Sequence, residues 1–205
     1  MIQPVAKLRF IERYCSPKDG WRVFVDIDPS EEGRTGSPRQ TEQAKVRQRL
    51  MLDQAPVAIR QLKDLGVFVG ERKRHWCAQF KERLLLPPGD RDILAVNTDR
   101  RILLVAEVEG DSSGQPEGKM YKALGQLVCA VTEMSIPNFE RFFLLVVWGD
   151  KMANHLMRAR SIQQLGVSGL VIGESAVEDQ WLFGKAWVAT EQKNAADGES
   201  VVAKR

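Results

Sequence analysis

The sequence has little of several features that commonly reveal the class of a protein. Its 205 residues include only three cysteines and two histidines. Cys15, Cys77 and Cys129 are far apart, lack the close spacing of zinc ligands, and are interpreted as buried or partly buried thiols. The longest apolar run, residues 142–148, has seven residues, whereas a transmembrane helix needs about 20. A disulfide framework, a zinc domain and a membrane span are therefore excluded.

Charge and signal motifs are also weak. Lys and Arg total 30 against 27 Asp and Glu, and the resulting net charge of +3 identifies no partner. No glycine-rich segment ends in the Gly-Lys-Ser/Thr of a phosphate-binding loop. The first ten residues lack the basic, apolar and small regions of a secretory signal. We therefore expect a cytoplasmic protein with no membrane contact.

What remains is the composition of a folded protein, with 43% hydrophobic and 28% charged residues. Its length allows one large domain or a core with a small appendage. Residues 7–14 and 21–27 flank the turn-forming sequence Ser-Pro-Lys-Asp-Gly and predict an amino-terminal β-hairpin. We expect residues 1–40 to form this peripheral hairpin and a loop, residues 41–190 to form the core, and residues 191–205 to be a disordered tail.

Within the core, the pattern predicts alternating helices and strands. A helix is expected over residues 41–65, capped by Thr41, kinked or split by Pro56 and stopped by Gly66. Strands over 75–80, 92–96 and 102–109 would form a meander, and a helix would reach about residue 134. A buried strand over 142–148, a helix capped by Asp150 and reaching residue 165, and a strand over 169–172 follow. This order predicts an α/β fold with a mixed central sheet flanked by helices.

Three acidic residues stand at the ends of two of these strands. Glu107 and Glu109 lie at i and i+2 at the end of an apolar strand, so both point to one face. Asp92 precedes the apolar residues of the neighbouring strand, and a hairpin would bring it beside Glu107. Exposed strand ends offer an ordinary explanation for such acids. Convergence of all three would instead favour a hard divalent cation, because carboxylates placed together repel one another.

With these residues in this order, the chain resembles the PD-(D/E)XK, or restriction-endonuclease-like, nuclease superfamily over residues 41–172. The resemblance implies an α-β-β-β-α-β core in which Gly89-Asp90-Arg91-Asp92-Ile93-Leu94 supplies the family's Asp. Glu107-Val108-Glu109 would occupy the acid-x-Lys element. Asp92 and Glu107 would then hold Mg²⁺, with Mn²⁺ as a substitute. We expect alanine variants of these two residues to lose cleavage and to keep the fold.

The sequence departs from the family where Glu109 replaces the family's lysine. Either Glu109 itself acts on the attacking water, or the lysine has migrated to Lys119 or Lys122, which share a helix face with Gln126. Gln126 sits where the family's helix often has a Gln, and Glu42 is similar to a helix glutamate that orients a metal-bound water in some members. The ordinary interpretation of both lysines is solvated helix cations.

A short basic cluster comes before the acids. Arg72, Lys73, Arg74 and Lys81 are interleaved with aromatic residues, which fits either a phosphate-facing strip or a solvated loop. Together with the resemblance, these residues predict a homodimeric, Mg²⁺-dependent DNA endonuclease of restriction or repair type. The alternative is a degenerate module of the same fold that binds nucleic acid or serves assembly without cutting. A third possibility is an unrelated α/β protein in which these acids are ordinary surface residues with no functional role.

Overall fold

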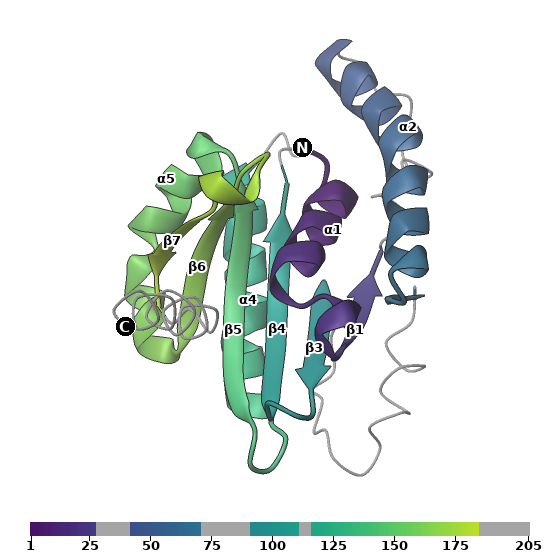
Figure 1. Ribbon diagram of the computed structural model, residues 1–205. Helices are drawn as coiled ribbons and strands as arrows, with labels where there is room; N and C mark the ends of the chain where they lie inside the picture. The colour runs from purple at the N-terminus through teal and green to yellow at the C-terminus, as the bar shows by residue number, and fades with distance from the viewer. Residues whose placement is uncertain (28–41, 71–90, 111–115, 185–205) are drawn as a thin grey trace, which may run out of the picture.

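The computed structural model describes residues 1–27, 42–70, 91–110 and 116–184. They form an α/β fold with one mixed sheet of seven strands, in the order β2-β1-β3-β4-β5-β6-β7 (Figure 1). The strands are β1 (Trp21–Asp26), β2 (Phe68–Gly70), β3 (Ile93–Asn97), β4 (Ile102–Glu109), β5 (Glu140–Trp148), β6 (Val167–Ile172) and β7 (Gln180–Phe183). The helices are α1 (Gln3–Tyr14), α2 (Glu42–Asp64), α4 (Pro116–Glu133) and α5 (Asp150–Arg158).

The sheet is mixed, as the sequence predicts. β3 pairs antiparallel with both β1 and β4, whereas β4, β5 and β6 run parallel to one another. The edge strands differ, since β2 is parallel to β1 and β7 is antiparallel to β6. The crossovers between parallel strands contain α2, α4 and α5. Short 3-10 helices at Pro17–Asp19, Arg160–Leu165 and Ala176–Glu178 complete the connections. The carboxyl ends of β4 and β5 therefore lie at the same edge of the sheet, beside the start of β3.

The predicted amino-terminal hairpin is wrong. Residues 3–14 form α1, in which Ala6, Phe10 and Ile11 are completely buried at helical spacing. The turn before Trp21 is present, with Gly20 in the left-handed region at φ 80°, but it joins a helix to a strand. β1 is not peripheral either, because it pairs with β2 on one side and β3 on the other.

From residue 42 the chain runs α2, β2, β3, β4, α4, β5, which is the predicted order of helices and strands. The predicted meander differs in its first strand, because β3 pairs with β1 and not with β2. The predicted strand over 75–80, the basic cluster Arg72, Lys73, Arg74 and Lys81, and the tail over 191–205 lie outside the described residues.

α2 matches the predicted helix, but it continues through Pro56 without a break. Proline removes a hydrogen bond to the carbonyl four residues earlier, which belongs to Leu52. Leu52 is half exposed, so water can reach this part of the helix. The helix ends as expected, with Gly66 at φ 86° and its N–H bonded to the carbonyl of Lys63.

The predicted helix over residues 150–165 is also shorter than expected. α5 ends at Arg158 and a 3-10 helix follows. Gly149 is its N-cap, and Asp150 occupies the first turn instead of capping the helix. Asp150 still places a negative charge at the positive end of the helix dipole.

The two described cysteines differ in burial. Cys15 is buried and Cys129 is exposed, so the prediction of a buried or partly buried thiol is wrong for Cys129.

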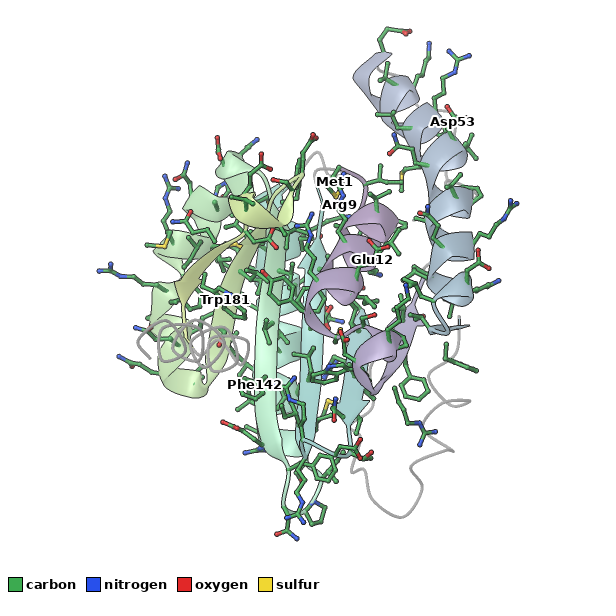
Figure 2. The ribbon with its side chains drawn as sticks, in the orientation of Figure 1. Met1, Arg9, Glu12, Asp53, Phe142 and Trp181 are labelled. Carbon is green, nitrogen blue, oxygen red and sulfur yellow. The ribbon has the colours of Figure 1, made fainter. Side chains whose placement is uncertain are left out.

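Two apolar layers enclose the sheet. α1 and α2 pack on one face against Ile102, Leu104, Ala106 and Val108, and α4 and α5 cover the other face (Figures 1 and 2). Leu103 and Val105 point to the α4 side, so the alternation of β4 places Glu107 and Glu109 on that side as well. None of the described helices combines the length and apolar character that a membrane-spanning segment requires.

Candidate active site

The three acids at the strand ends lie in one electrostatic cluster. Glu107 and Glu109, at the end of β4, are only 4% and 8% exposed, and the Asp92 side chain is 16% exposed. The backbone N–H of Val108 donates to Oδ2 of Asp92 at 2.8 Å, which joins the start of β3 to the end of β4. The acids therefore do not fan out into solvent. Asp92 raises the pKa of both glutamates, and Glu109 raises that of Glu107.

A lysine that sequence reasoning missed enters this cluster from α1. Lys7 is completely buried, and its Nζ lies 2.7 Å from Oδ1 of Asp92. The same Nζ donates to the carbonyl of Asp26 at 2.7 Å, at the end of β1. A buried ammonium must be paired, because its desolvation costs several kcal/mol. The repulsion at Asp92 is therefore relieved by a cation from the protein itself.

The first turn of α1 completes the surroundings of Asp92. Nε2 of Gln3 donates to Oδ2 of Asp92 at 3.2 Å. This close approach depends on Gly110, where an added Cβ would lie 2.8 Å from the carbonyl oxygen of Met1 and 2.9 Å from the N of Gln3. α1 thus begins directly beside the end of β4, where the positive end of its dipole favours acidic groups.

The spacing of residues along α1 is a signal in the sequence for the roles of Gln3 and Lys7. These two residues recur with Phe10 and Tyr14 at the spacing of one helix face. Lys7 lies on this face between the buried Gln3 and Phe10. A lysine at a core position of an amphipathic helix needs an acidic partner. The hairpin prediction places residues 7–14 in a strand, so it makes no use of this helical spacing.

Glu107 carries the most perturbed carboxyl group of the cluster. Burial, followed by repulsion from Asp92, raises its pKa from 4.5 to about 9, although Arg91 and Lys7 oppose the shift. Its Oε1 is buried and has no hydrogen-bond partner. A buried acceptor without a partner costs free energy, so this oxygen is suited to receive a ligand.

Glu109 is the second buried acid with an unpaired oxygen, its Oε2. Burial, followed by Asp92, raises its pKa from 4.5 to about 7. Lys119, Lys7 and Lys122 lower it. Lys119 and Lys122 are exposed on α4, close enough to act on Glu109 electrostatically.

The remaining predicted site residues differ in position. Gln126 is partly buried on α4, the helix that also carries Lys119 and Lys122. Glu42 is 83% exposed and its Oε1 lies 2.6 Å from Nζ of Lys45. It stands in the first turn of α2, which projects beyond the sheet (Figure 1). The structure therefore does not bring Glu42 into the buried acid cluster.

The contacts of the three acids limit which oxygens could hold a metal ion. Among the described residues, no group of three or more His, Cys, Asp or Glu side chains is arranged to hold a metal ion. Both oxygens of Asp92 already have partners, Lys7 on Oδ1 and Gln3 and Val108 on Oδ2. Among the described carboxylates, the buried oxygens without a hydrogen-bond partner are Oε1 of Glu107 and Oε2 of Glu109.

Comparison with known proteins adds no further evidence. No protein-family model, curated protein or solved structure matches this chain. The chemistry of the site must therefore be argued from the geometry of its own residues.

The raised pKa of Glu107 predicts a loss of stability with rising pH. The folded state holds the proton to about pH 9, whereas the unfolded chain releases it near pH 4.5, so the free energy of unfolding falls between these values. Glu107→Gln removes this term, and we expect it to stabilise the fold by about 3 kcal/mol at pH 7, since each pH unit is equivalent to about 1.4 kcal/mol. Urea unfolding of both proteins from pH 5 to 9 measures the difference. Parallel pH profiles would contradict the prediction.

Proposed function

We propose that this protein is a Mg²⁺-dependent nuclease that hydrolyses phosphodiester bonds in DNA. The observation that carries the proposal is the contact of the buried Lys7 ammonium with an acid cluster whose two glutamates retain unpaired oxygens. The adjacent strands β1, β3, β4 and β5, with Asp92 directly before β3 and Glu107 on β4, support a restriction-endonuclease-like core. Since one such site cuts one strand, the proposal includes a homodimer.

The donor set fits Mg²⁺. This ion is usually held by one or two carboxylates together with waters and substrate phosphate, and does not need an all-protein cage. Oε1 of Glu107 would provide one such ligand, and Oε2 of Glu109 would accept a hydrogen bond from a water on the ion. Asp92 would contribute through a rearrangement of its contact with Lys7. A bound Mg²⁺ polarises the phosphate, lowers the pKa of a water and stabilises the leaving oxygen.

The residues of the chain have separate tasks in this proposal. Glu109, whose pKa is about 7, is poised to accept a proton from a water near neutral pH. Lys7 holds Asp92 in place and supplies a fixed positive charge beside the site. The exposed ammonium groups of Lys119 and Lys122 are placed near Glu109 to attract the DNA backbone.

One observation favours the alternative of a module that binds nucleic acid without cutting. The salt bridge from Lys7 already neutralises Asp92, so this residue does not need a metal ion for compensation. In that case the cationic side chains would bind DNA, and the buried Glu107 would stay protonated at neutral pH. Cleavage distinguishes the two functions, because only a nuclease changes the substrate.

A plasmid-nicking assay tests the proposal. Supercoiled DNA is incubated with the full chain in Mg²⁺, in Mn²⁺ and in EDTA, and open-circular product is expected only with the metals. Glu107→Gln is the active-site control, since it removes a charge and keeps the shape of the side chain. DNA binding without nicking under all metal conditions would support the non-cutting module and overturn the proposed nuclease.

The raised carboxyl pKa values also predict pH-dependent metal binding. Binding of Mg²⁺ must displace the proton that Glu107 holds near neutral pH. We expect the affinity to rise by about tenfold per pH unit between pH 7 and 9, where one proton is released. Calorimetry with Mg²⁺ in buffers of different ionisation enthalpy measures both the affinity and the proton count. Equal affinity at pH 6 and 9 would count against glutamate ligands.

A further inference from the structure

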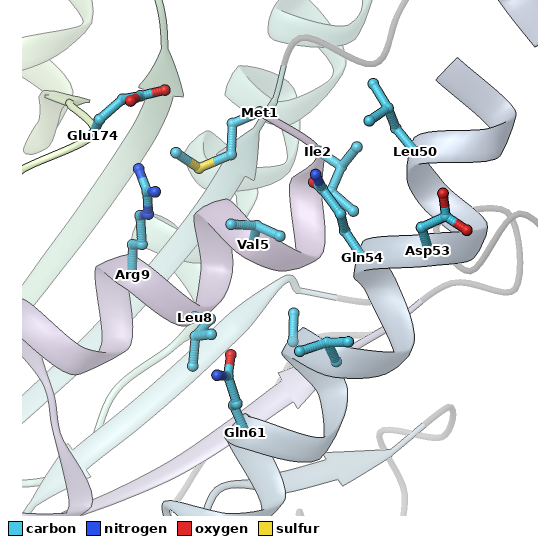
Figure 3. Close-up of a pocket in the computed structure, with 12 residues that line it drawn as sticks. Met1, Ile2, Val5, Leu8, Arg9, Leu50, Asp53, Gln54, Gln61 and Glu174 are labelled. Carbon is cyan, nitrogen blue, oxygen red and sulfur yellow. The ribbon is translucent and has the colours of Figure 1, made fainter. Parts of the chain in front are cut away.

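A groove of about 690 Å³ with a mainly apolar lining lies between α1 and α2. Figure 3 shows Ile2 and Val5, before and within α1, on one side and Leu50 and Gln54 of α2 on the other. The amino-terminal half of α2 extends past the end of α1 (Figure 1).

The α2 wall of this groove continues as an exposed apolar stripe. Val46, Leu50 and Val57 lie at i, i+4 and i+11, on one face of the helix. All three are exposed, with 42% of Leu50 accessible. Leu50 and Val57 are two turns apart, with Asp53 and Gln54 between them on this side of the helix. Apolar side chains gathered on one exposed face mark interaction sites on folded proteins. A groove between two helices is a common receptor for a third helix.

The charges beside the stripe identify the partner. Glu42, Arg49, Asp53 and Arg60 are all exposed and follow one edge of the stripe with alternating sign. If two copies of α2 pack antiparallel about a symmetry axis near residue 51, Arg49 faces Asp53 of the partner subunit. The same axis places Glu42 opposite Arg60 of the partner subunit. Such self-complementarity is what a symmetric homodimer requires.

We propose that α2 is the homodimer interface, in which the stripe of each copy packs antiparallel into the α1–α2 groove of the other. Apolar contacts of Leu50 and Val57 provide the buried centre, and the flanking ion pairs set direction and register. Glu42 exchanges its contact with Lys45 for the pair across the axis. The interface specifies the homodimer of the proposed function, but it is argued from this helix alone.

Sedimentation equilibrium of the full chain tests the interface. We expect a mass of twice 23.1 kDa for the wild type. For Leu50→Glu we expect a dissociation constant of the dimer that is about a hundredfold higher. Leu52→Glu is the matched control, because Leu52 is 50% exposed but lies roughly 200° around the same helix. A wild-type monomer up to the solubility limit, or equal effects of the two variants, would overturn the interface.

Charge reversal tests the antiparallel arrangement. Arg49→Asp and Asp53→Arg should each weaken the dimer by about tenfold, because each places like charges opposite one another. The double variant restores opposite charges across the axis and should recover the wild-type dissociation constant. Additive loss in the double variant would exclude this register.

Dye binding tests a different occupant of the groove. A wild-type monomer that binds an apolar dye, with binding lost in Leu50→Glu, would assign the groove to a small ligand and overturn the proposal.

These measurements separate the interface from the nuclease. The stripe variants leave Asp92, Glu107 and Lys7 unchanged, and they are read out as mass. A dimer disrupted by Leu50→Glu in a protein that never nicks DNA would support the interface and reject the nuclease. Nicking by a wild-type protein that stays monomeric would do the reverse.

Discussion

Glu107→Gln is expected to reduce Mg²⁺-dependent DNA cleavage by about a thousandfold or more, because it removes a metal-binding charge from the centre of the site. The amide keeps the volume of the side chain, and the loss of a carboxyl that is costly to bury should raise stability. Activity and stability should therefore change in opposite directions. Initial rates of plasmid nicking and urea unfolding curves on the same preparations measure both.

The controls for this variant come from the same protein. Glu12→Gln changes an exposed carboxylate on α1 and should leave cleavage within about twofold of the wild type. Glu109→Gln should also reduce cleavage strongly and, unlike Glu107→Gln, should remove the pH dependence near pH 7. If Glu107→Gln cuts DNA at the wild-type rate with Mg²⁺ present, the proposed metal site is wrong.

Lys7→Met is expected to destabilise the fold by about 3–5 kcal/mol, although both side chains are similar in size. Removing one partner of a buried salt bridge leaves the other charge uncompensated. Lys7 is completely buried against Asp92 and the carbonyl of Asp26. Chemical denaturation at pH 7 measures the loss, and Lys18→Met, at an exposed lysine, is the control.

The partner variant completes a double-mutant cycle. Asp92→Asn alone should also destabilise the fold, because it leaves the Lys7 ammonium buried without a counter-charge. The double variant with Lys7→Met removes both charges and should recover much of the loss. Additive losses would show that the two residues do not act as a pair. This salt bridge also revises the expectation that removing Asp92 leaves the fold intact.

Cleavage by a folded Lys7 variant further defines the role of the lysine. At a temperature where Lys7→Met is still folded, a structural role alone would leave kcat unchanged. If Lys7 supplies positive charge to the site, its replacement by Met would lower kcat with little change in KM. Lys7→Arg retains a charge but not the compact ammonium, so partial recovery of kcat would support the electrostatic role.

Local patterns made much of the fold predictable. The apolar run in residues 142–148, the Gly66 stop and the Glu-x-Glu at the end of β4 are each visible within a few residues. Such signals depend on nearest neighbours, so they survive without knowledge of the tertiary structure. The amino-terminal segment failed because its apolar residues were interpreted as a strand, although their spacing also fits the buried face of α1.

The sequence by itself determined the α/β class, the position of the acids at adjacent strand ends and the absence of a long apolar segment. Only the tertiary structure decided that α1 carries Lys7 to Asp92, 85 residues further along the chain. It also decided that β1 lies inside the sheet and that α2 presents an apolar stripe beside a groove. The physical reason is that burial and charge compensation depend on which distant segments pack together, and a local pattern does not contain that information.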